Sequence, residues 1–384
     1  MKIVRVQVLE FHRRLDGTAW NPAFRWNERR APLLVIETDA GISGVGEAWS
    51  RQAECPRVLD CLADLWAPAL LGNDPRDPAS LVARLEPLMP STHSWVDAAA
   101  ASAVDIALWD IAARAAGMPL WKALGGHSGR TAVYASGGLY RDGGSLDDLA
   151  REFEGYADLG FDAMKMKIGA LSLDADIERV RRVRGAIGDQ RVLWVDAVNQ
   201  LTRDNARAWC DALAAFRVAA IQAPLTSDDL AGMAGINLRL PVVANEAAFS
   251  EAQFGDLLDS GAVGYLQFCV GLCGGFTAAT RIDRNARSHA VRSTPQCFST
   301  AILQAASLHF GAAMSNTATV EYHRFHDHMS AALPAAMKKV QQGCVHLDDG
   351  PGLGVMPPLP GPQSGGGEVR SHRIVEVPHY ARHG

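Results

Sequence analysis

No apolar run in the 384-residue chain approaches the roughly 20 residues that span a membrane, so we expect no membrane-spanning helix. The first residues, MKIVRVQVLEF, alternate as a strand does and lack the uninterrupted apolar segment of a signal peptide. Positive charge is not in excess, since 37 Lys and Arg face 42 Asp and Glu, and this balance argues against a nucleic-acid-binding surface. The seven cysteines are scattered and odd in number, unlike the disulfide framework of a small secreted domain, which favours the reducing cytoplasm.

What is present indicates a folded protein with a large core, because 48% of the residues are hydrophobic and 21% are charged. The length suits two domains, or one large α/β barrel with an attachment. Residues 1–125 show strand patterns followed by helical ones, which predicts a small α+β domain. The predicted strands are 2–11, 33–38 and 41–47, and the predicted helices are 56–70 and 96–116.

Residues 126–345 repeat a short apolar strand pattern followed by a helical stretch, eight times in all. Eight such units predict a (β/α)8 barrel rather than an open dinucleotide-binding sheet, which would need G-x-G-x-x-G after a strand. The predicted strands lie at Val133, 163–167, 192–196, 219–222, 242–245, 265–268, 291–294 and 319–321. Residues 346–384 are rich in Gly and Pro before a β-like run at 372–377, which we expect to fold back onto the first domain.

Two lysines close the second barrel strand, and alternation places Lys165 and Lys167 on the same side of it. Chemistry in barrels takes place where strands end, at the C-terminal face. If that side is the interior, burial and mutual repulsion would lower the pKa of both amines towards that of a working base. The same spacing is also compatible with a salt-bridged pair at the barrel rim.

Carboxylates follow two other strands, at Asp196 and at Glu246. Acids that converge on one mouth repel each other unless a cation lies between them, and hard oxygen ligands suit Mg²⁺. Singly, each acid is better explained as a helix cap or a rim charge. Together with the lysines, they predict a metal-assisted active site.

In this order the motifs resemble the mandelate racemase/muconate lactonising branch of the enolase superfamily, over nearly the whole chain. The resemblance rests on Lys165-x-Lys167, Asp196, the strand end Ile221-Gln-Ala-Pro-Leu225, Glu246 and Gly274-Gly275. It implies a modified TIM barrel with an N-terminal α+β capping domain (1–125) that the C-terminal segment (346–384) completes. Residues around Glu321 and 349–354 are similar to acid-sugar dehydratases and sugar-lactone cycloisomerases.

The resemblance implies that a substrate carboxylate binds one Mg²⁺ per subunit while a base removes the proton from the adjacent carbon. Lys167 would be the base, and Lys165 would lower its pKa and help to hold the carboxylate. Asp196, Gln222 and Glu246 would be the metal ligands. The implied partner is a small-molecule carboxylate substrate, and barrels of this branch are usually homo-oligomers.

Four positions depart from the family pattern. Gln222 stands where a glutamate ligand is usual, and an amide in place of an acid should weaken Mg²⁺ binding. Cys269 and Gln296 replace the aspartate and histidine of the second acid/base dyad, and Asn199 lies one residue later than the pattern. Racemisation needs a base on each face of the substrate carbon, so dehydration or cycloisomerisation is favoured.

Other side chains are candidates for substrate binding or proton donation. Glu321 closes the last strand, and His323, His326 and His328 follow it; each histidine is either a proton donor or a solvated loop residue. Cys269 is either a thiol acid or a packing residue. The loop 20–26 contains Arg25 and Trp26, which either bind substrate and exclude water or simply pack on the barrel.

Three functions are compatible with these residues. The first is a Mg²⁺-dependent lyase or isomerase of an acid sugar or its lactone. The second is a binding homologue that has lost turnover, motivated by Gln222, Cys269 and Gln296. The third is a Schiff-base aldolase that uses Lys165 or Lys167 and needs no metal.

Overall fold

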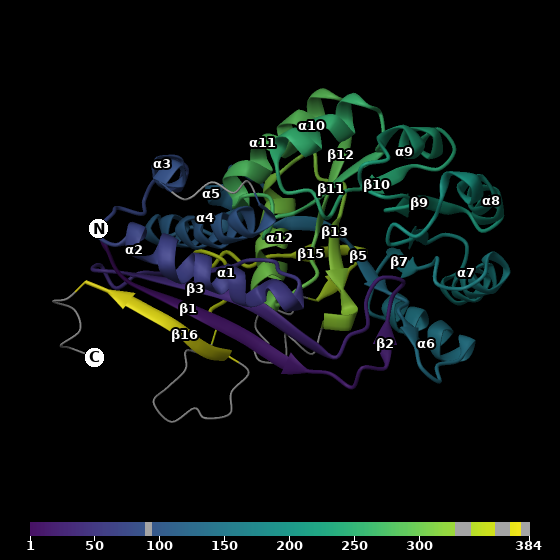
Figure 1. The fold of residues 1–384 in the computed structure, drawn as a ribbon, viewed down its shortest axis with the longest axis horizontal. Helices are drawn as coiled ribbons and strands as arrows, with labels where there is room; N and C mark the ends of the chain where they lie inside the picture. The colour runs from purple at the N-terminus through teal and green to yellow at the C-terminus, as the bar shows by residue number, and fades with distance from the viewer. Residues whose placement is uncertain (89–93, 327–338, 358–368, 378–384) are drawn as a thin grey trace.

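The computed structural model describes residues 1–88, 94–326, 339–357 and 369–377, which form a cap beside a barrel (Figure 1). The cap contains a four-stranded antiparallel sheet in the order β16-β1-β3-β4. Its strands are β1 (Ile3–Arg14), β3 (Glu28–Thr38), β4 (Ser43–Glu47) and β16 (Val369–Glu376). The C-terminal strand β16 pairs with β1, with Phe11 opposite Val369, so the end of the chain returns to the cap.

Helices cover one face of the cap sheet. The predicted helix 56–70 consists of α1 (Cys55–Cys61), a π-helical turn (Leu62–Trp66) and α2 (Ala67–Leu70). The long helix α4 (Trp95–Ala115) starts with a capping box between Ser94 and Asp97. It packs so closely on β4 that a Cβ at Gly44 or Gly46 would clash with backbone oxygens of α4.

Eight parallel strands form the barrel: β5 (Arg130–Gly137), β7 (Ala163–Lys167), β8 (Val192–Asp196), β9 (Val218–Gln222), β10 (Val242–Ala244), β11 (Tyr265–Cys269), β12 (Arg292–Gln296) and β13 (Val320–His323). β13 pairs with β5, and one parallel bridge, Ser293 to Thr317, joins β12 to the segment before β13. The predicted α/β fold class, a capped barrel of the TIM type, is therefore confirmed.

Seven helices connect these strands and surround them: α6 (Leu146–Asp158), α7 (Leu173–Ile187), α8 (Arg203–Ala214), α9 (Leu230–Asn237), α10 (Glu251–Asp259), α11 (Gly275–Ser288) and α12 (Ala301–Ala313). Shorter elements are β2 (Ala19–Trp20), α3 (Pro78–Leu85), α5 (Leu120–Ala123), β6 (Tyr140–Arg141), β14 (Val340–Gln341), β15 (Cys344–His346) and 3₁₀ turns at 52–54, 86–88 and 324–326.

Two elements differ from the predicted ones. The seventh strand continues past Thr294 to Gln296 although Pro295 interrupts its hydrogen-bonding pattern. Pro295 is tolerated because β12 pairs along its length only with β11 and offers a single bridge on its other edge. Strand β15 was not predicted; it lies antiparallel to β5, with Cys344 opposite Ala132.

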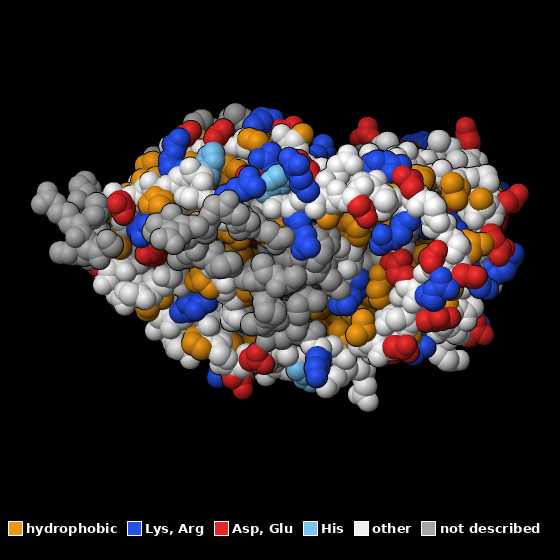
Figure 2. All heavy atoms as spheres, turned by 90° about the horizontal axis from the view of Figure 1, so that it is seen from below, with side chains coloured by type: hydrophobic (Ala, Val, Ile, Leu, Met, Phe, Trp, Pro, Cys, Tyr) orange, Lys and Arg blue, Asp and Glu red, His pale blue; other side chains and the backbone are white. Residues whose placement is uncertain are grey.

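On the face seen in Figure 2, acidic and basic side chains are interspersed over the barrel end of the molecule. Arg182 of α7 pairs with Asp147 of α6 and links the two helices, whereas Arg181 pairs with Glu178 within α7. Within the described ranges, no helix is long and apolar enough to cross a bilayer.

Candidate active site

The interior of the barrel is built in layers, because alternate residues of each strand point inward. A lower layer is apolar and contains Tyr134, Trp194, Ala220 and Val243, with Tyr265 packed against it. The next inward residues towards the strand ends are polar. Both lysines of β7 lie among them, with Lys165 1% and Lys167 7% exposed, while Met164 and Met166 point into the core between the strands and helices.

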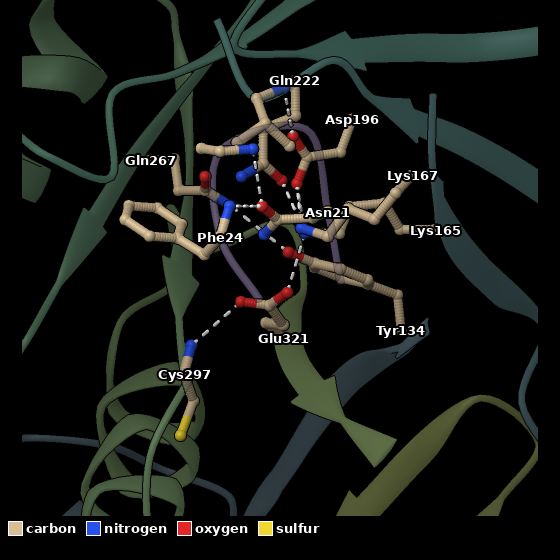
Figure 3. A network of polar contacts seen from close by, with 12 residues as sticks. Asn21, Phe24, Tyr134, Lys165, Lys167, Asp196, Gln222, Gln267, Cys297 and Glu321 are labelled. Carbon is tan, nitrogen blue, oxygen red and sulfur yellow. Dashed lines mark hydrogen bonds and ion pairs between the residues drawn. The ribbon is translucent and has the colours of Figure 1, made fainter. Parts of the chain in front are cut away.

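Lys165 lies at the centre of this polar layer and contacts three strands at once (Figure 3). Its Nζ donates to Asp196 Oδ2 at 3.0 Å, to Gln222 Oε1 at 2.9 Å and to Glu321 Oε1 at 2.9 Å. Burial alone would lower the pKa of Lys165, but the charges of Asp196 and Glu321 outweigh it and raise that pKa well above its ordinary value. The expectation of a lowered pKa is therefore wrong for Lys165.

Lys167 has a different environment although it is only two residues away. Its Nζ contacts one carboxylate, donating to Asp196 Oδ2 at 2.5 Å. Burial lowers the pKa of Lys167, and the nearby charge of Lys165 adds to this effect while Asp196 opposes it. Asp196 is itself buried, but the two ammonium groups hold its pKa at about 2. The cluster thus contains an amine with a raised pKa beside one with a lowered pKa.

Glu246 follows β10 and completes the set of predicted metal ligands. Its Oε2 is buried and has no hydrogen-bond partner among the described residues. Burial, with the charge of Asp196 adding to it, raises the pKa of Glu246 to about 7. A buried carboxylate oxygen without a partner is costly, and a cation would relieve both effects.

The donor set fits a hard cation such as Mg²⁺, since Asp196, Gln222 and Glu246 offer two carboxylates and an amide oxygen. In the described part of the chain, His, Cys, Asp and Glu side chains alone form no group of three that could hold a metal ion. A third oxygen ligand from a side chain would be the amide oxygen of Gln222, which accepts a hydrogen bond from Lys165.

The opposite wall of the mouth carries neutral polar groups. Gln267 on β11 donates to the Tyr134 hydroxyl at 3.2 Å. Gln267 Oε1, Thr294 Oγ1 and Gln296 Oε1 are buried without a hydrogen-bond partner in the described residues. Sequence reasoning missed Gln267 and Thr294, although their inward register beside Cys269 and Gln296 was a signal that could have found them.

Other predicted residues are distributed around this cluster. Glu321 is 1% exposed, and its Oε2 accepts from the backbone N–H of Cys297 at 3.2 Å. His323 is buried with its ring 4.6 Å from that of Phe298. Cys269 belongs to the hydrophobic core, and burial raises the pKa of its thiol. Asn199 is half-buried in the loop after β8, at a φ of 59°.

The cap loop 20–26 lies at the mouth, as Figure 3 shows for Asn21 and Phe24. Trp26 is buried, and its ring lies 4.9 Å from that of Phe298. Arg25 does not reach the lysine cluster but pairs with Asp142 at 2.5 Å. The side chain of His326 and all of His328 lie outside the described residues.

Two cap residues missed by sequence reasoning hold the loop between β12 and α12. Glu47 accepts from the backbone N–H groups of Thr300 at 3.1 Å and Leu303 at 2.9 Å, at the start of α12. Arg29 is buried and donates to the carbonyl of Phe298 at 2.9 Å. The cap therefore positions the loop whose Cys297 contacts Glu321.

Two cavities lie outside the mouth. One of about 380 Å³ is lined by residues of β6, α6 and α7, and one of about 280 Å³ lies beside α7 and α8. Neither is lined by Lys165, by Lys167 or by the three predicted metal ligands, Asp196, Gln222 and Glu246. Both cavities are therefore separate from the residues that the sequence predicts for the active site.

The fold is a capped (β/α)8 barrel in which two lysines of one strand face acids at the ends of other strands. Residues 25–125 match the mandelate racemase / muconate lactonizing enzyme N-terminal domain, and residues 148–358 match the enolase C-terminal domain-like family. The chain belongs to the mandelate racemase/muconate lactonizing branch of the enolase superfamily.

Named relatives include enzymes of acid-sugar metabolism. The D-galactarolactone cycloisomerase of Agrobacterium fabrum is 30% identical over 92% of this chain and 96% of its own length. The structure of L-talarate/galactarate dehydratase from Salmonella typhimurium is 25% identical, with a TM-score of 0.85 over 93% of this chain and 90% of that one. A Streptomyces coelicolor racemase structure with bound magnesium is 26% identical, with a TM-score of 0.84 over 92% and 97%.

Proposed function

We propose that this protein is an acid-sugar dehydratase or sugar-lactone cycloisomerase that removes the proton next to a substrate carboxylate. The observation that carries the proposal is the pair of β7 lysines in two charge environments, both in contact with Asp196. The cycloisomerase and dehydratase among its relatives support the same class of reaction.

Lys167 is the proposed base. Its lowered pKa leaves a larger fraction of neutral amine near neutral pH than an exposed lysine would have, so its Nζ is suited to accept a proton. Lys165 is the proposed fixed positive charge, because three acceptors hold its ammonium in place and keep it protonated. Together they bind and orient a carboxylate while one of them moves the proton.

Asp196, Gln222 and Glu246 are the proposed ligands of Mg²⁺. When bound, the ion supplies positive charge that stabilises the electron density left by loss of the proton. The apolar layer beneath and the cap loop above exclude water, which strengthens every charge interaction in the mouth. The dependence on an amide ligand predicts that Mg²⁺ binds more weakly than it would to three carboxylates.

The neutral side chains of β11 and β12 favour proton transfer on only one face of the substrate carbon. Gln267 and Gln296 cannot accept a proton at neutral pH, so the described side chains on that wall offer no second base for racemisation. They can hydrogen-bond the hydroxyl groups of a polyol chain. We assign the return of the proton to Lys167 itself. The α C–H bond breaks and Nζ gains the proton, the electron pair of that bond forms a C=C bond as the β C–O bond breaks, and the departing oxygen on the same face takes the proton from Nζ.

The test is to incubate the protein and Mg²⁺ in D₂O with a panel of acid sugars and their lactones. We expect a 2-keto acid or a rearranged lactone from at least one member. In D₂O a 2-keto acid should carry deuterium at the carbon next to its keto group, and recovered substrate should carry deuterium at the α-carbon. Both signals should be lost in EDTA. A panel left unchanged, with no deuterium exchange, would overturn the proposal.

A second candidate is a binding homologue without turnover, which the amides at Gln222 and Gln296 favour. Titration calorimetry separates it from the enzyme, because ligand binding without Mg²⁺ uptake or exchange supports the homologue. A Schiff-base aldolase is tested by borohydride trapping with a keto acid, where a stable adduct on Lys165 or Lys167 would support it.

A further inference from the structure

Behind the catalytic strand lies a buried arginine that does not touch the mouth. Arg179 on α7 is 6% exposed, and its guanidinium donates to the backbone carbonyl of Lys167 at 2.8 Å. It also donates to the carbonyl of Gly138 at 2.8 Å and to Asp176 Oδ1 at 3.1 Å. One guanidinium thus joins the ends of two neighbouring strands to the helix that packs behind them.

The register explains why these carbonyls need a partner. In the parallel pair β5 and β7, Ser136 lies opposite Lys165 and Gly137 lies opposite Met166, where the ladder ends. The carbonyls of Gly138 and Lys167 come one residue later, beyond the last rung. Since a buried carbonyl without a donor is costly, Arg179 extends the ladder by one rung through its side chain. Its planar, pre-organised fork holds the two carbonyls at fixed positions.

The same arginine is in contact with the cap loop through two aromatic rings. The guanidinium carbon of Arg179 lies 3.8 Å from the ring centroid of Tyr140, whose hydroxyl donates to Asp176 at 2.7 Å. On its other side Tyr140 stacks on Trp20, with 4.7 Å between centroids and an interplanar angle of 22°. Trp20 belongs to β2, which pairs with β6 at the start of the cap loop.

We propose that Arg179 is a positioning residue for Lys167, and that the stack of Tyr140 and Trp20 ties the seating of the cap loop to the position of that base. The inference rests on the proposed function only for the role of Lys167. Arg179 holds the backbone of Lys167, whereas Asp196 contacts its amine. The stack of Tyr140 and Trp20 links the position of the cap loop to that backbone.

The composition allows a direct test, because the chain has six lysines and two of them are Lys165 and Lys167. In protein labelled with [ε-¹³C]lysine, Lys167→Arg identifies the Lys167 resonance by its loss. We expect Arg179→Met to move that resonance and Arg179→Lys to restore it in part. Trp20→Ala should move it in the same direction by a smaller amount.

The matched control is Arg184 on the same helix. It is also buried and donates only to backbone carbonyls, those of Phe216, Gly188, Arg191 and Arg217. Arg184→Met should leave the Lys167 resonance in place even if it lowers the melting temperature. An unmoved resonance in folded Arg179→Met, or an equal movement in Arg184→Met, would overturn the inference. If Arg179→Met does not fold, Arg179→Lys and Trp20→Ala decide by the same criterion.

Steady-state kinetics test the role of Arg179 independently. On a substrate that the unaltered protein turns over, Arg179→Met should lower kcat by about 10²-fold, the cost of a base misplaced by about 1 Å, with KM little changed. Arg179→Lys should recover part of kcat. A KM increase without a kcat loss would contradict the assignment. Absence of any turnover in the unaltered protein would count against the proposed function alone, since the resonance measurement still decides the role of Arg179.

Discussion

Lys165 and Gln222 are joined by a hydrogen bond of 2.9 Å at the centre of the barrel mouth, where the ammonium donates to the amide oxygen. The amide is neutral, so the acceptors of Lys165 carry only the charges of Asp196 and Glu321. The charges of the two lysines and these two acids therefore balance. Glu246 is left as the additional acid, and burial, with the charge of Asp196 adding to it, raises its pKa to about 7.

This balance predicts the effect of an acid at position 222. Gln222→Glu should tighten Mg²⁺ binding by about tenfold or more, because a third carboxylate adds a charged ligand. Titration calorimetry measures the dissociation constant. The matched control is Gln267→Glu, which adds the same charge to the neutral wall and should change Mg²⁺ affinity much less. Equal affinities in Gln222→Glu and the unaltered protein would show that residue 222 does not bind the ion.

Removal of the base should abolish proton exchange. Lys167→Ala is expected to reduce deuterium incorporation at the substrate α-carbon by at least about 10²-fold, because general-base catalysis by a positioned side chain contributes that much. Nuclear magnetic resonance of the recovered substrate measures it, and circular dichroism checks that the fold persists. Lys122→Ala, at an exposed lysine of α5, should exchange at the unaltered rate. Retained exchange in Lys167→Ala would refute the assignment.

A base introduced at the ends of β11 and β12 should allow proton exchange from the second face of the substrate carbon. Gln296→His combined with Cys269→Asp places a histidine and an acid on adjacent strand ends that are directly in register. We expect the double variant to exchange the α-proton from both faces and to produce some of the epimer, which chiral chromatography detects. Gln296→Asn, which keeps an amide, serves as the control. One-faced exchange in a folded double variant would show that this wall does not face the reacting carbon.

The interface between cap and barrel predicts a pH-dependent stability. Asp105 on α4 is buried and accepts from the backbone N–H of Thr277 at 3.1 Å, and burial raises its pKa to about 7. Unfolded, it would titrate near its ordinary value of about 3.9. Between these values the folded state binds a proton that the unfolded state has lost. Stability contributed by Asp105 is therefore full below about pH 4, falls as the pH rises to about 7, and is constant above.

Urea unfolding at pH 5 and pH 8 measures this effect. The slope from Asp105 has an upper limit of about 1.4 kcal/mol per pH unit, and Asp105→Asn should remove it. Asp148→Asn is the control, because hydrogen bonds from Ser145 hold the pKa of Asp148 at about 2, below the measured window. An unchanged slope in Asp105→Asn would mean that Asp105 titrates outside this range.

Much of the site was predictable because strand alternation is a local property. Lys165 and Lys167 are separated by one residue, so they share a face whatever the remainder of the chain does. Asp196, Gln222 and Glu246 each come at or just after a strand end, and parallel strands in a barrel bring those ends to one rim. The loop 20–26 was singled out from the sequence, although the partner of Arg25 was not predicted.

The charge states were not predictable in the same way. The sequence spacing predicted a lowered pKa for both lysines, whereas Glu321, 156 residues further along the chain, holds Lys165 charged. The carbonyl contact of Arg179 with Lys167 depends equally on how α7 packs behind two strands. Contacts between residues that are distant in the sequence produce no periodic pattern from which they could be predicted.

By itself, the sequence determined the capped barrel, the rim that carries the chemistry and the identity of the polar side chains there, because hydrophobic period and strand register are local. Only the tertiary structure decided which lysine stays charged, which carboxylate oxygen lacks a partner and which arginine supports the base. Those outcomes depend on closure of the barrel and docking of the cap, which bring distant charges within a few ångströms in a dry interior where their interaction is strong.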